Sequence, residues 1–298
     1  MAGIWSGCSN QLGARAVRGL IAESCRGIHA AKTKPVPATW DPNGITAAWL
    51  GHSTVLINFY GLNILTDPVL GRRIGADTLI GTVGPKRLVA AALKPNELPA
   101  IDLVLLSHAH LDHTDLASLR ALPGQPQAVA AHATEDLLDH TPLQDPVTLR
   151  WGEAAQLLTR NGAIRVQAFE VKHWGARWRH DTYRGYNGYI VSREGKQFIF
   201  GGDTAWCESF RDLRDSGPYE FAIMPIGAYQ PWIWSHCTPE QAARMAESAG
   251  AKCILPVHFK TFPFGREATT EPLARLEVAI EPERIGWRDV GQTFRAEA

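Results

Sequence analysis

The chain has 298 residues, of which 45% are hydrophobic and 20% are charged, a balance typical of a folded globular protein rather than a disordered or fibrous one. Thirty basic residues offset thirty acidic residues, so the net charge does not favour nucleic acid or an anionic membrane as a general partner. Apolar runs stay shorter than the roughly 18 residues that a membrane-spanning helix needs, so we expect no transmembrane segment.

The cysteines and the N-terminal composition bear on location. The five cysteines are scattered and lack a C-x-x-C spacing, which argues against a disulfide framework and favours a reducing, cytoplasmic location. Residues 1–36 are basic and rich in small residues, so they form an N-terminal extension that is either disordered or an organellar transit peptide. In the second case the location is organellar. We expect residues 37–298 to form a single domain.

The first half of this domain alternates strand and loop patterns. Residues 44–70 carry β-branched and aromatic runs broken at Y-G-L-N, where Gly61 and Asn63 can take positive φ, and they predict two or three antiparallel strands. Residues 72–88 hold too many glycines for a regular element and are expected to form a long loop. The apolar run at 101–107 predicts a buried strand, followed by a short helix that Thr114 can cap.

In the second half, each predicted strand ends at a polar residue. Residues 163–174 predict a strand ending at His173, and residues 188–204 predict a hairpin that turns at R-E-G-K and ends at Asp203. Residues 220–229 predict a further strand.

One helix is marked at both of its ends. Thr238 can cap a helix that begins with Pro239, Gln241 can close a capping box, and Gly250 can end the helix before a strand at 252–259. Strands alternating with helices predict one α/β domain with sheets inside and helices outside.

The segment S-H-A-H-L-D-H, at residues 107–113, follows the buried strand. Residues two apart share a face in an extended segment, so His108, His110 and Asp112 can point the same way, and the start of the helix brings His113 round. Four ligands from so short a segment cannot all bind one tetrahedral ion. We therefore expect two ions, one held by two imidazoles and the other by Asp112 and His113.

The missing ligands can come from other strand ends. His173, Asp203 and His258 each follow a predicted strand, and they bring the set to five histidines and two aspartates. Asp203 can bridge both ions through its two oxygens, an arrangement that holds two metals about 3.5 to 4 Å apart in hydrolytic sites.

These motifs resemble those of a known superfamily. H-A-H-L-D-H, a distal His, a G-G-D-T strand end and a C-terminal His are similar to the metallo-β-lactamase superfamily. The phrases W-L-G-H-S-T-V-L-I, L-T-D-P-V, G-P-K-R-L, M-P-I-G-A-Y and H-F-K-T-F, between about Trp49 and Phe264, resemble the branch that contains N-acylphosphatidylethanolamine-hydrolysing phospholipase D. The resemblance implies an αββα sandwich with two mixed sheets inside, helices outside and a two-metal site at one edge.

The resemblance also implies roles for single residues. One metal would be held by His108, His110 and His173, the other by Asp112, His113 and His258, with Asp203 bridging both. The cofactor implied is two Zn²⁺ per chain, with iron or manganese as alternatives. Asp112 would orient the attacking metal-bridging hydroxide, and His236 would contact substrate or donate a proton to the leaving group. The usual His-Trp-Gly around the last ligand is here His258, Phe259 and Lys260.

Residues around the expected ligands have two interpretations each. His52 and Asp67 either hold metal-bound imidazoles or are ordinary buried polar residues. Trp174, Trp206, Trp232 and Trp234 lie near expected ligands in the sequence, so they either belong to the core or form an apolar rim that binds an acyl chain.

The leading hypothesis is a dinuclear zinc-dependent hydrolase that cleaves phosphodiesters, with a small-molecule or lipid-like substrate. A lactonase, or another ester or amide hydrolase of the same fold, is the alternative. A metal-binding protein without turnover and a nucleic-acid-processing protein belong to other classes; the latter would need a basic patch or an added domain, so we expect no nucleic-acid partner. Peripheral contact with a membrane and a homodimer are both compatible with the sequence.

Overall fold

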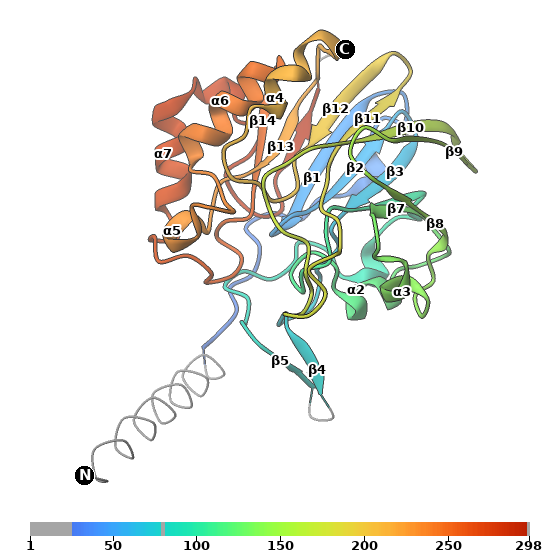
Figure 1. The fold of residues 1–298 in the computed structure, drawn as a ribbon, viewed down its shortest axis with the longest axis horizontal. Helices are drawn as coiled ribbons and strands as arrows, with labels where there is room; N and C mark the ends of the chain where they lie inside the picture. Colours follow the sequence, from blue (N-terminus) through green and yellow to red (C-terminus); the bar gives the residue numbers. More distant parts are fainter. Residues whose placement is uncertain (1–25, 79–80, 297–298) are drawn as a thin grey trace.

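Two β-sheets packed face to face form the centre of the molecule, as the computed structural model shows for residues 26–78 and 81–296 (Figure 1). Most of the expected N-terminal extension, residues 1–25, lies outside the described residues. From Arg26 onward the chain runs beside residues 88–90, where the His29 amide donates a hydrogen bond to the Leu88 carbonyl.

The first sheet starts with the antiparallel strands expected near the N-terminus. Its order is β15 (Thr293–Arg295), β1 (Ile45–Gly51), β2 (Thr54–Phe59), β3 (Leu62–Thr66), β6 (Leu103–Leu106), β7 (Gln127–Ala131) and β8 (Gln144–Leu149). The pairs from β15 to β3 are antiparallel, and those from β3 to β8 are parallel. Tyr60 and Gly61 form the turn between β2 and β3, both at positive φ as in a type I′ turn, whereas Asn63 lies within β3.

The second sheet is also mixed. Its order is β14 (Ile254–Val257), β13 (Ala222–Pro225), β12 (Lys196–Phe200), β11 (Gly188–Arg193), β10 (Gly162–Phe169) and β9 (Ala154–Thr159). Strands β12, β13 and β14 are parallel, and the other pairs are antiparallel. The hairpin of β11 and β12 turns at Glu194 and Gly195, both at positive φ, as the R-E-G-K motif predicts.

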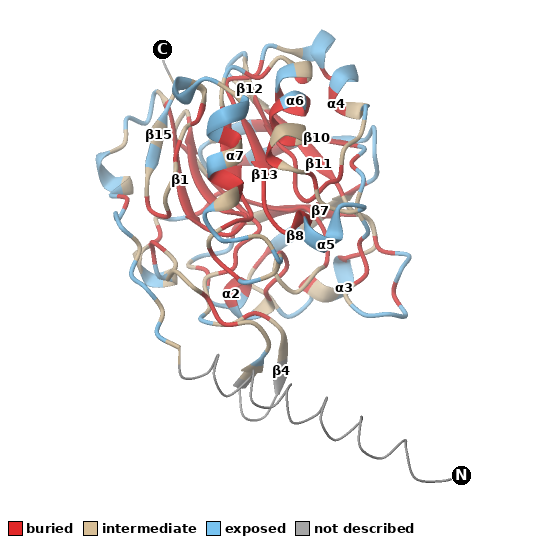
Figure 2. Cartoon of the chain, turned by 90° about the vertical axis from the view of Figure 1, so that its left-hand side faces the viewer, coloured by how far each residue is buried: buried red, intermediate tan, exposed pale blue. Residues whose placement is uncertain are grey.

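The core lies between the sheets and extends under the helices (Figure 2). Phe59 of β2 meets Phe198 of β12 edge to face across the sandwich, with ring centroids 5.3 Å apart. All residues of β1, β2 and β6 are buried, as expected for strands that are covered on both faces.

Helices lie outside the sheets, as expected. They are α2 (Leu116–Arg120), α3 (Glu135–Leu138), α4 (Ser209–Asp212), α5 (Tyr229–Trp232), α6 (Pro239–Ala249) and α7 (Glu271–Ala279), with 3₁₀ turns η1 (Pro37–Thr39), η2 (Pro95–Glu97), η3 (Arg214–Ser216) and η4 (Pro282–Arg284). Figure 1 shows α4, α6 and α7 together beside β13 and β14, with α2 and α3 at the opposite side. Thr238 and Gln241 form the predicted capping box of α6, and Gly250 ends it at φ 84°. No helix in the described ranges is long and apolar enough to cross a bilayer.

Three local expectations are corrected. Residues 72–88 are not wholly loop, because β4 (Ala76–Thr78) pairs with β5 (Gly81–Val83). Asp115 caps α2 through the Ser118 amide, while Thr114 instead donates its hydroxyl hydrogen bond to the His108 carbonyl. Strands β10 and β12 end before His173 and Asp203, so these side chains lie on loops that follow the strands.

Candidate metal centre

The expected metal ligands meet at one edge of the sandwich, in the loops that follow β6, β10, β12 and β14. Three of them form a first group, in which His110 Nδ1 lies 2.8 Å from His108 Nε2 and 3.3 Å from His173 Nε2. One nitrogen of each imidazole can therefore face a common point, and the three residues could hold an ion together.

A second group lies beside the first. Asp112 Oδ2 is 3.5 Å from His113 Nε2 and 3.5 Å from His258 Nε2. His52 joins this group, because its Nε2 is only 3.0 Å from the same Asp112 oxygen. The structure thus places His52 against a predicted ligand, where it can either orient Asp112 or offer a nitrogen of its own.

Asp203 lies between the two groups. Its Oδ2 is 3.1 Å from His113 Nε2 and 3.2 Å from His258 Nε2 in the second group, and 3.9 Å from His173 Nε2 in the first. A single carboxylate therefore reaches both sets of imidazoles, which is the position expected of a bridging ligand.

Unpaired buried atoms show that this cluster fits a cation. Asp203 Oδ1, His113 Nε2 and His258 Nε2 are buried, and none has an aligned hydrogen-bond partner within the described part of the chain. Buried polar atoms are nearly always paired, so unpaired nitrogen and oxygen atoms gathered in one cluster favour a metal. Imidazole and carboxylate are a donor set that zinc accepts.

The tautomers of three imidazoles are set from outside the cluster. Asp67 Oδ2 lies 2.6 Å from His113 Nδ1, Ser107 Oγ lies 2.9 Å from His108 Nδ1, and the Ser235 carbonyl accepts from His173 Nδ1 at 2.8 Å. With hydrogen on Nδ1, the Nε2 lone pair of each ring faces the cluster. Asp67 is therefore a hydrogen-bond partner of His113, one of the expected ligands.

Ser107 was not anticipated as part of the site. Its amide and hydroxyl donate to the two carboxylate oxygens of Asp67 at 2.8 and 2.6 Å, and the hydroxyl also contacts His108. Ser107 thereby orients the His108 imidazole directly and the His113 imidazole through Asp67. The available signal was its position as the first residue of S-H-A-H-L-D-H.

Burial and the neighbouring charges shift the pKa values of the histidines in opposite directions. Burial lowers the pKa of His110 to about 3 and the pKa of His108 well below its usual value, so both rings are neutral at pH 7. For His258, burial lowers the pKa, but the carboxylates of Asp203 and Asp112 outweigh it and raise the pKa to about 9. In the absence of metal, a proton on His258 therefore offsets some of the negative charge in the cluster.

The backbone of the site is strained. His52, Asp67 and His258 take φ values of 54°, 32° and 64°, in the left-handed region that costs non-glycine residues on the order of 1–3 kcal/mol each. Hydrogen bonds from the His52 amide to Thr261 Oγ1 and from the His258 amide to the His52 carbonyl hold the turn after β1 against the turn after β14. Such strain concentrates at functional sites, where it aims particular side chains.

Arg177, which the sequence analysis did not predict as part of the site, holds the loop that contains His108, His110 and His113. Its Nη1 donates hydrogen bonds to the carbonyls of Ala109 and Thr114 at 3.0 and 2.8 Å. The loop after β10, which carries His173, is thereby tied to the loop after β6.

The remaining predicted residues lie at the cluster, on the exposed surface beside it or against the core. His236 joins the cluster, with Nδ1 3.8 Å from Asp203 Oδ2, and Trp174 lies 4.5 Å from His110 between ring centroids. Trp232 and Trp234 flank this region on α5 and just after it, with 55% and 82% of their surface exposed. Trp206 packs against the core beneath the Arg244 guanidinium, and no ring contact joins it to the cluster within the described ranges.

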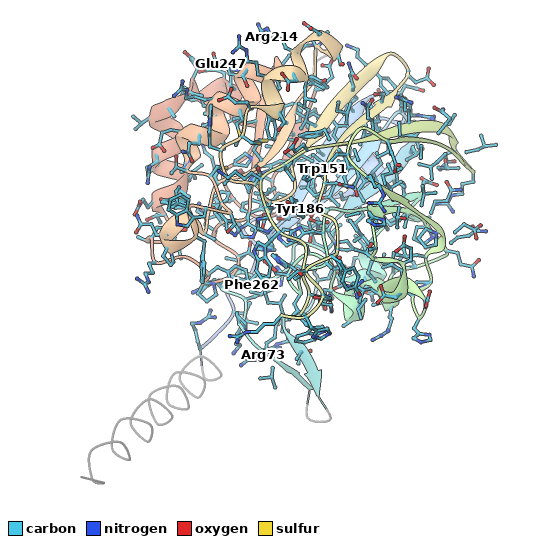
Figure 3. The ribbon with its side chains drawn as sticks, in the orientation of Figure 1. Arg73, Trp151, Tyr186, Arg214, Glu247 and Phe262 are labelled. Carbon is cyan, nitrogen blue, oxygen red and sulfur yellow. The ribbon has the colours of Figure 1, made fainter. Side chains whose placement is uncertain are left out.

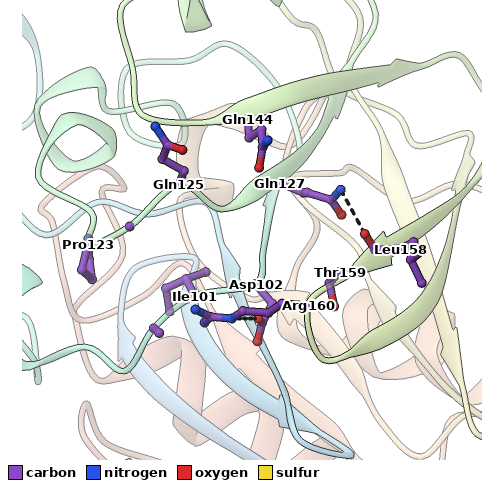
Figure 4. Close-up of a pocket in the computed structure, with 11 residues that line it drawn as sticks. Ile101, Asp102, Pro123, Gln125, Gln127, Gln144, Leu158, Thr159 and Arg160 are labelled. Atoms are coloured by element: carbon purple, nitrogen blue, oxygen red, sulfur yellow. Dashed lines mark hydrogen bonds and ion pairs between the residues drawn. The ribbon is translucent and has the colours of Figure 1, made fainter.

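Two further aromatic residues line the cluster. Tyr186 lies 6.5 Å from His173 and Phe262 lies 5.3 Å from His52, between ring centroids; Figure 3 labels both. A separate polar cavity of about 290 Å³ lies at the other end of β6, where Asp102, Gln127 and Arg160 line it (Figure 4). None of the clustered histidines contributes to that cavity.

Comparison with known proteins agrees with the fold. The model of the beta-lactamase superfamily domain matches residues 62–259. N-acyl-phosphatidylethanolamine-hydrolyzing phospholipase D 1 of Caenorhabditis elegans is 30% identical over 263 residues, which cover 80% of this chain and 70% of the relative. An uncharacterized protein of Mycobacterium tuberculosis is 32% identical over 257 residues, covering 82% of this chain; the chain spans 66% of that relative's length.

A solved structure has the same architecture. Igni18, described as a novel metallo hydrolase from Ignicoccus hospitalis, aligns with a TM-score of 0.64 and 21% identity over 85% of this chain and 99% of its own. At this identity the likeness concerns the fold, which is the αββα sandwich with two mixed sheets. The chain belongs to the metallo-β-lactamase superfamily.

Proposed function

We propose that the protein is a dinuclear zinc-dependent hydrolase that cleaves phosphodiesters bearing a lipid-like or other apolar substituent. The observation that carries the proposal is the position of Asp203, whose carboxylate approaches both groups of imidazoles while its Oδ1 is unpaired within the described part of the chain. A site for one ion would not need a carboxylate between two sets of donors.

The relatives support the reaction class. The matched protein of Caenorhabditis elegans is named as a phospholipase D that hydrolyses N-acyl-phosphatidylethanolamine, and a mitochondrial protein of Saccharomyces cerevisiae with the same activity in its name is 29% identical over 249 residues. The chain spans only 51% of the yeast relative. A phospholipase D cleaves a phosphodiester, so we place phosphodiesters ahead of esters, lactones and amides.

The proposed ligands are divided between two ions, one for each of the two groups of residues. One ion would be held by His108, His110 and His173, the other by Asp112, His113 and His258, and both by Asp203. When bound, two zinc ions lower the pKa of water and stabilise the negative charge that develops on the substrate. Ser107 and Asp67 keep the imidazoles oriented.

His236 would act on the substrate rather than on metal. Burial lowers its pKa to about 3, so the ring is neutral at pH 7 and retains one N–H. That N–H can hydrogen-bond to a substrate oxygen beside Asp203. Exposed Trp174, Trp232 and Trp234 offer large apolar surfaces for the rest of the substrate.

Metal counting combined with a hydrolysis screen tests this function. We expect two zinc ions per chain and cleavage of N-acylphosphatidylethanolamine and bis(p-nitrophenyl) phosphate, both lost on chelation and restored by zinc. Cleavage confined to lactones or carboxylic esters would overturn the reaction class. Full metal occupancy without any hydrolysis would instead identify a metal-binding protein.

A further inference from the structure

A cavity of about 240 Å³ lies against His258, beside the proposed metal centre. Its apolar lining is formed by Ala228, Phe259, Phe262, Pro263, Phe264 and Pro272. Sites that enclose whole drug-sized ligands have volumes of roughly 300–1,000 Å³. This cavity therefore has room for a substituent of a substrate, but not for an entire lipid.

The turn after β14 makes the cavity and the cluster share a wall. His258 and Lys260 both have left-handed backbone, with φ values of 64° and 56°, and the chain bends back over the site. As a result the Phe264 ring lies 5.9 Å from His258 and 5.5 Å from His52, between centroids. Phe262 packs beside it, 5.7 Å away, at the position labelled in Figure 3. A group in this cavity would therefore contact the His258 and Phe264 rings, which also border the cluster.

The wall is preorganised from beneath. Buried Thr261 accepts a hydrogen bond from the His52 amide at 2.7 Å, which ties the turn to the loop after β1. The buried guanidinium of Arg87 lies 5.0 Å from the centre of the Phe262 ring and donates to the Val69 and Gly71 carbonyls. The aromatic rings are therefore held in place before any ligand arrives.

Apart from His258, the charged residues of the lining are already paired. The carboxylate of Glu267 accepts hydrogen bonds from the amides of Ala228 and Gln230 at 2.5 and 3.2 Å. Lys260 Nζ donates to the Arg288 carbonyl at 2.9 Å and lies 3.1 Å from Asp289 Oδ1. What remains for a ligand is mainly hydrocarbon surface, which favours an uncharged apolar group.

We infer that this cavity binds a short alkyl or aryl substituent of the substrate while the hydrolysable group lies on the cluster. The inference deepens the proposed function and rests on it for the placement of that group. Trp232 and Trp234 are outside the cavity lining, so the two apolar regions can be separated by mutation.

Calorimetric titration of the zinc-loaded protein with methyl-, butyl- and octylphosphonate tests the inference. We expect affinity to rise about threefold to fourfold per added methylene from methyl to butyl, as burial of each CH₂ implies. The rise should stop before octyl, because the cavity is then full. Phe264→Ala should remove most of the rise without changing zinc content, whereas Trp234→Ala should leave the rise intact.

Phe264→Trp provides a second variant, because it fills the cavity instead of emptying it. It should reduce the affinity for butylphosphonate to that for methylphosphonate. Equal affinity for all three phosphonates in the wild type would overturn the inference, as would a rise abolished by Trp234→Ala and kept by Phe264→Ala. The titration does not depend on turnover. Chain-length dependence without phosphodiester cleavage would sink only the proposed function, and cleavage without chain-length dependence would sink only the cavity assignment.

Discussion

The two edges of the sandwich each bury a carboxylate, and the two carboxylates have opposite surroundings. At the start of β6, Asp102 accepts hydrogen bonds from the Asn63 amide at 2.8 Å, from Arg160 Nε at 2.7 Å and from Asn161 Nδ2 at 3.0 Å. At the other edge, Asp203 Oδ1 has no partner in the described ranges, and the histidines that approach Oδ2 are not aligned for hydrogen bonds.

This difference indicates that Asp102 contributes to the stability of the fold, whereas Asp203 contributes to function. A fully hydrogen-bonded buried carboxylate contributes to the native fold, whereas one without aligned partners is costly to bury. The strained φ values of His52, Asp67 and His258 fall at the edge of Asp203 as well. The hydrogen bonds of Asp102 therefore stabilise the fold at one edge of the sandwich. At the other edge, Asp203 is left available for a positively charged ligand.

Asp203→Asn should give the largest effect, because it removes the charge that both proposed ions share. We expect at least one zinc ion to be lost and hydrolysis to fall by at least about 10²-fold. Zinc content and kcat measured on the same preparation check this. Two bound ions with unchanged turnover would refute the proposed ligand set.

Asp67→Asn should have a smaller effect on the same edge. The amide keeps the shape but weakens the contact with His113 Nδ1, so zinc affinity should fall about 10- to 100-fold, as for other groups that orient metal-bound histidines. Competition with a chromogenic chelator measures the dissociation constant. Unchanged affinity would mean that Asp67 serves only the fold.

Asp102→Asn is the matched control at the opposite edge. It weakens the contacts with Arg160 and the Asn63 amide, so we expect a loss of about 1–3 kcal/mol in the free energy of unfolding. Zinc content and kcat should stay at wild-type levels. A loss of zinc from this variant would contradict the view that Asp102 serves only the fold.

The metal-free protein should be most stable near pH 6.5. Burial lowers the pKa of His52, His110 and His236 to about 3, so below pH 6.5 the unfolded chain binds protons that the folded chain does not, and stability falls with acid. The pKa of His258 is raised to about 9, against burial, by Asp203 and Asp112. Its contribution is therefore complete below pH 6.5 and is lost as the pH rises through 9.

Thermal unfolding after chelation, followed across this pH range, checks the profile. Zinc should shift the optimum to higher pH, because the metal replaces the proton on His258. A metal-free profile that keeps rising from pH 6.5 to 9 would contradict the assigned protonation.

The sequence predicted the parts of this molecule whose signals are local. The capping box at Thr238 and Gln241 and the hairpin turn at Gly195 depend on neighbours in the chain, and both were confirmed. The fold class followed from the strand and helix alternation and from the family motifs. The cap of α2 was misplaced by one residue, because Thr114 is engaged by the His108 carbonyl and leaves Asp115 to cap.

What could not be predicted depends on long-range packing. Nothing near Arg177 indicates that it reaches the carbonyls of Ala109 and Thr114, and nothing near Phe264 indicates that it covers His52. Trp206 shows the opposite case. It is close to Asp203 in the sequence, yet it is half-buried against the core.

A crystal structure of the zinc-loaded protein, with zinc located by anomalous scattering, tests the central claim most directly. The account predicts two ions about 3.5 to 4 Å apart, bridged by Asp203, with His108, His110 and His173 on one and Asp112, His113 and His258 on the other. A single ion, or a pair to which Asp203 is not bound, would contradict it.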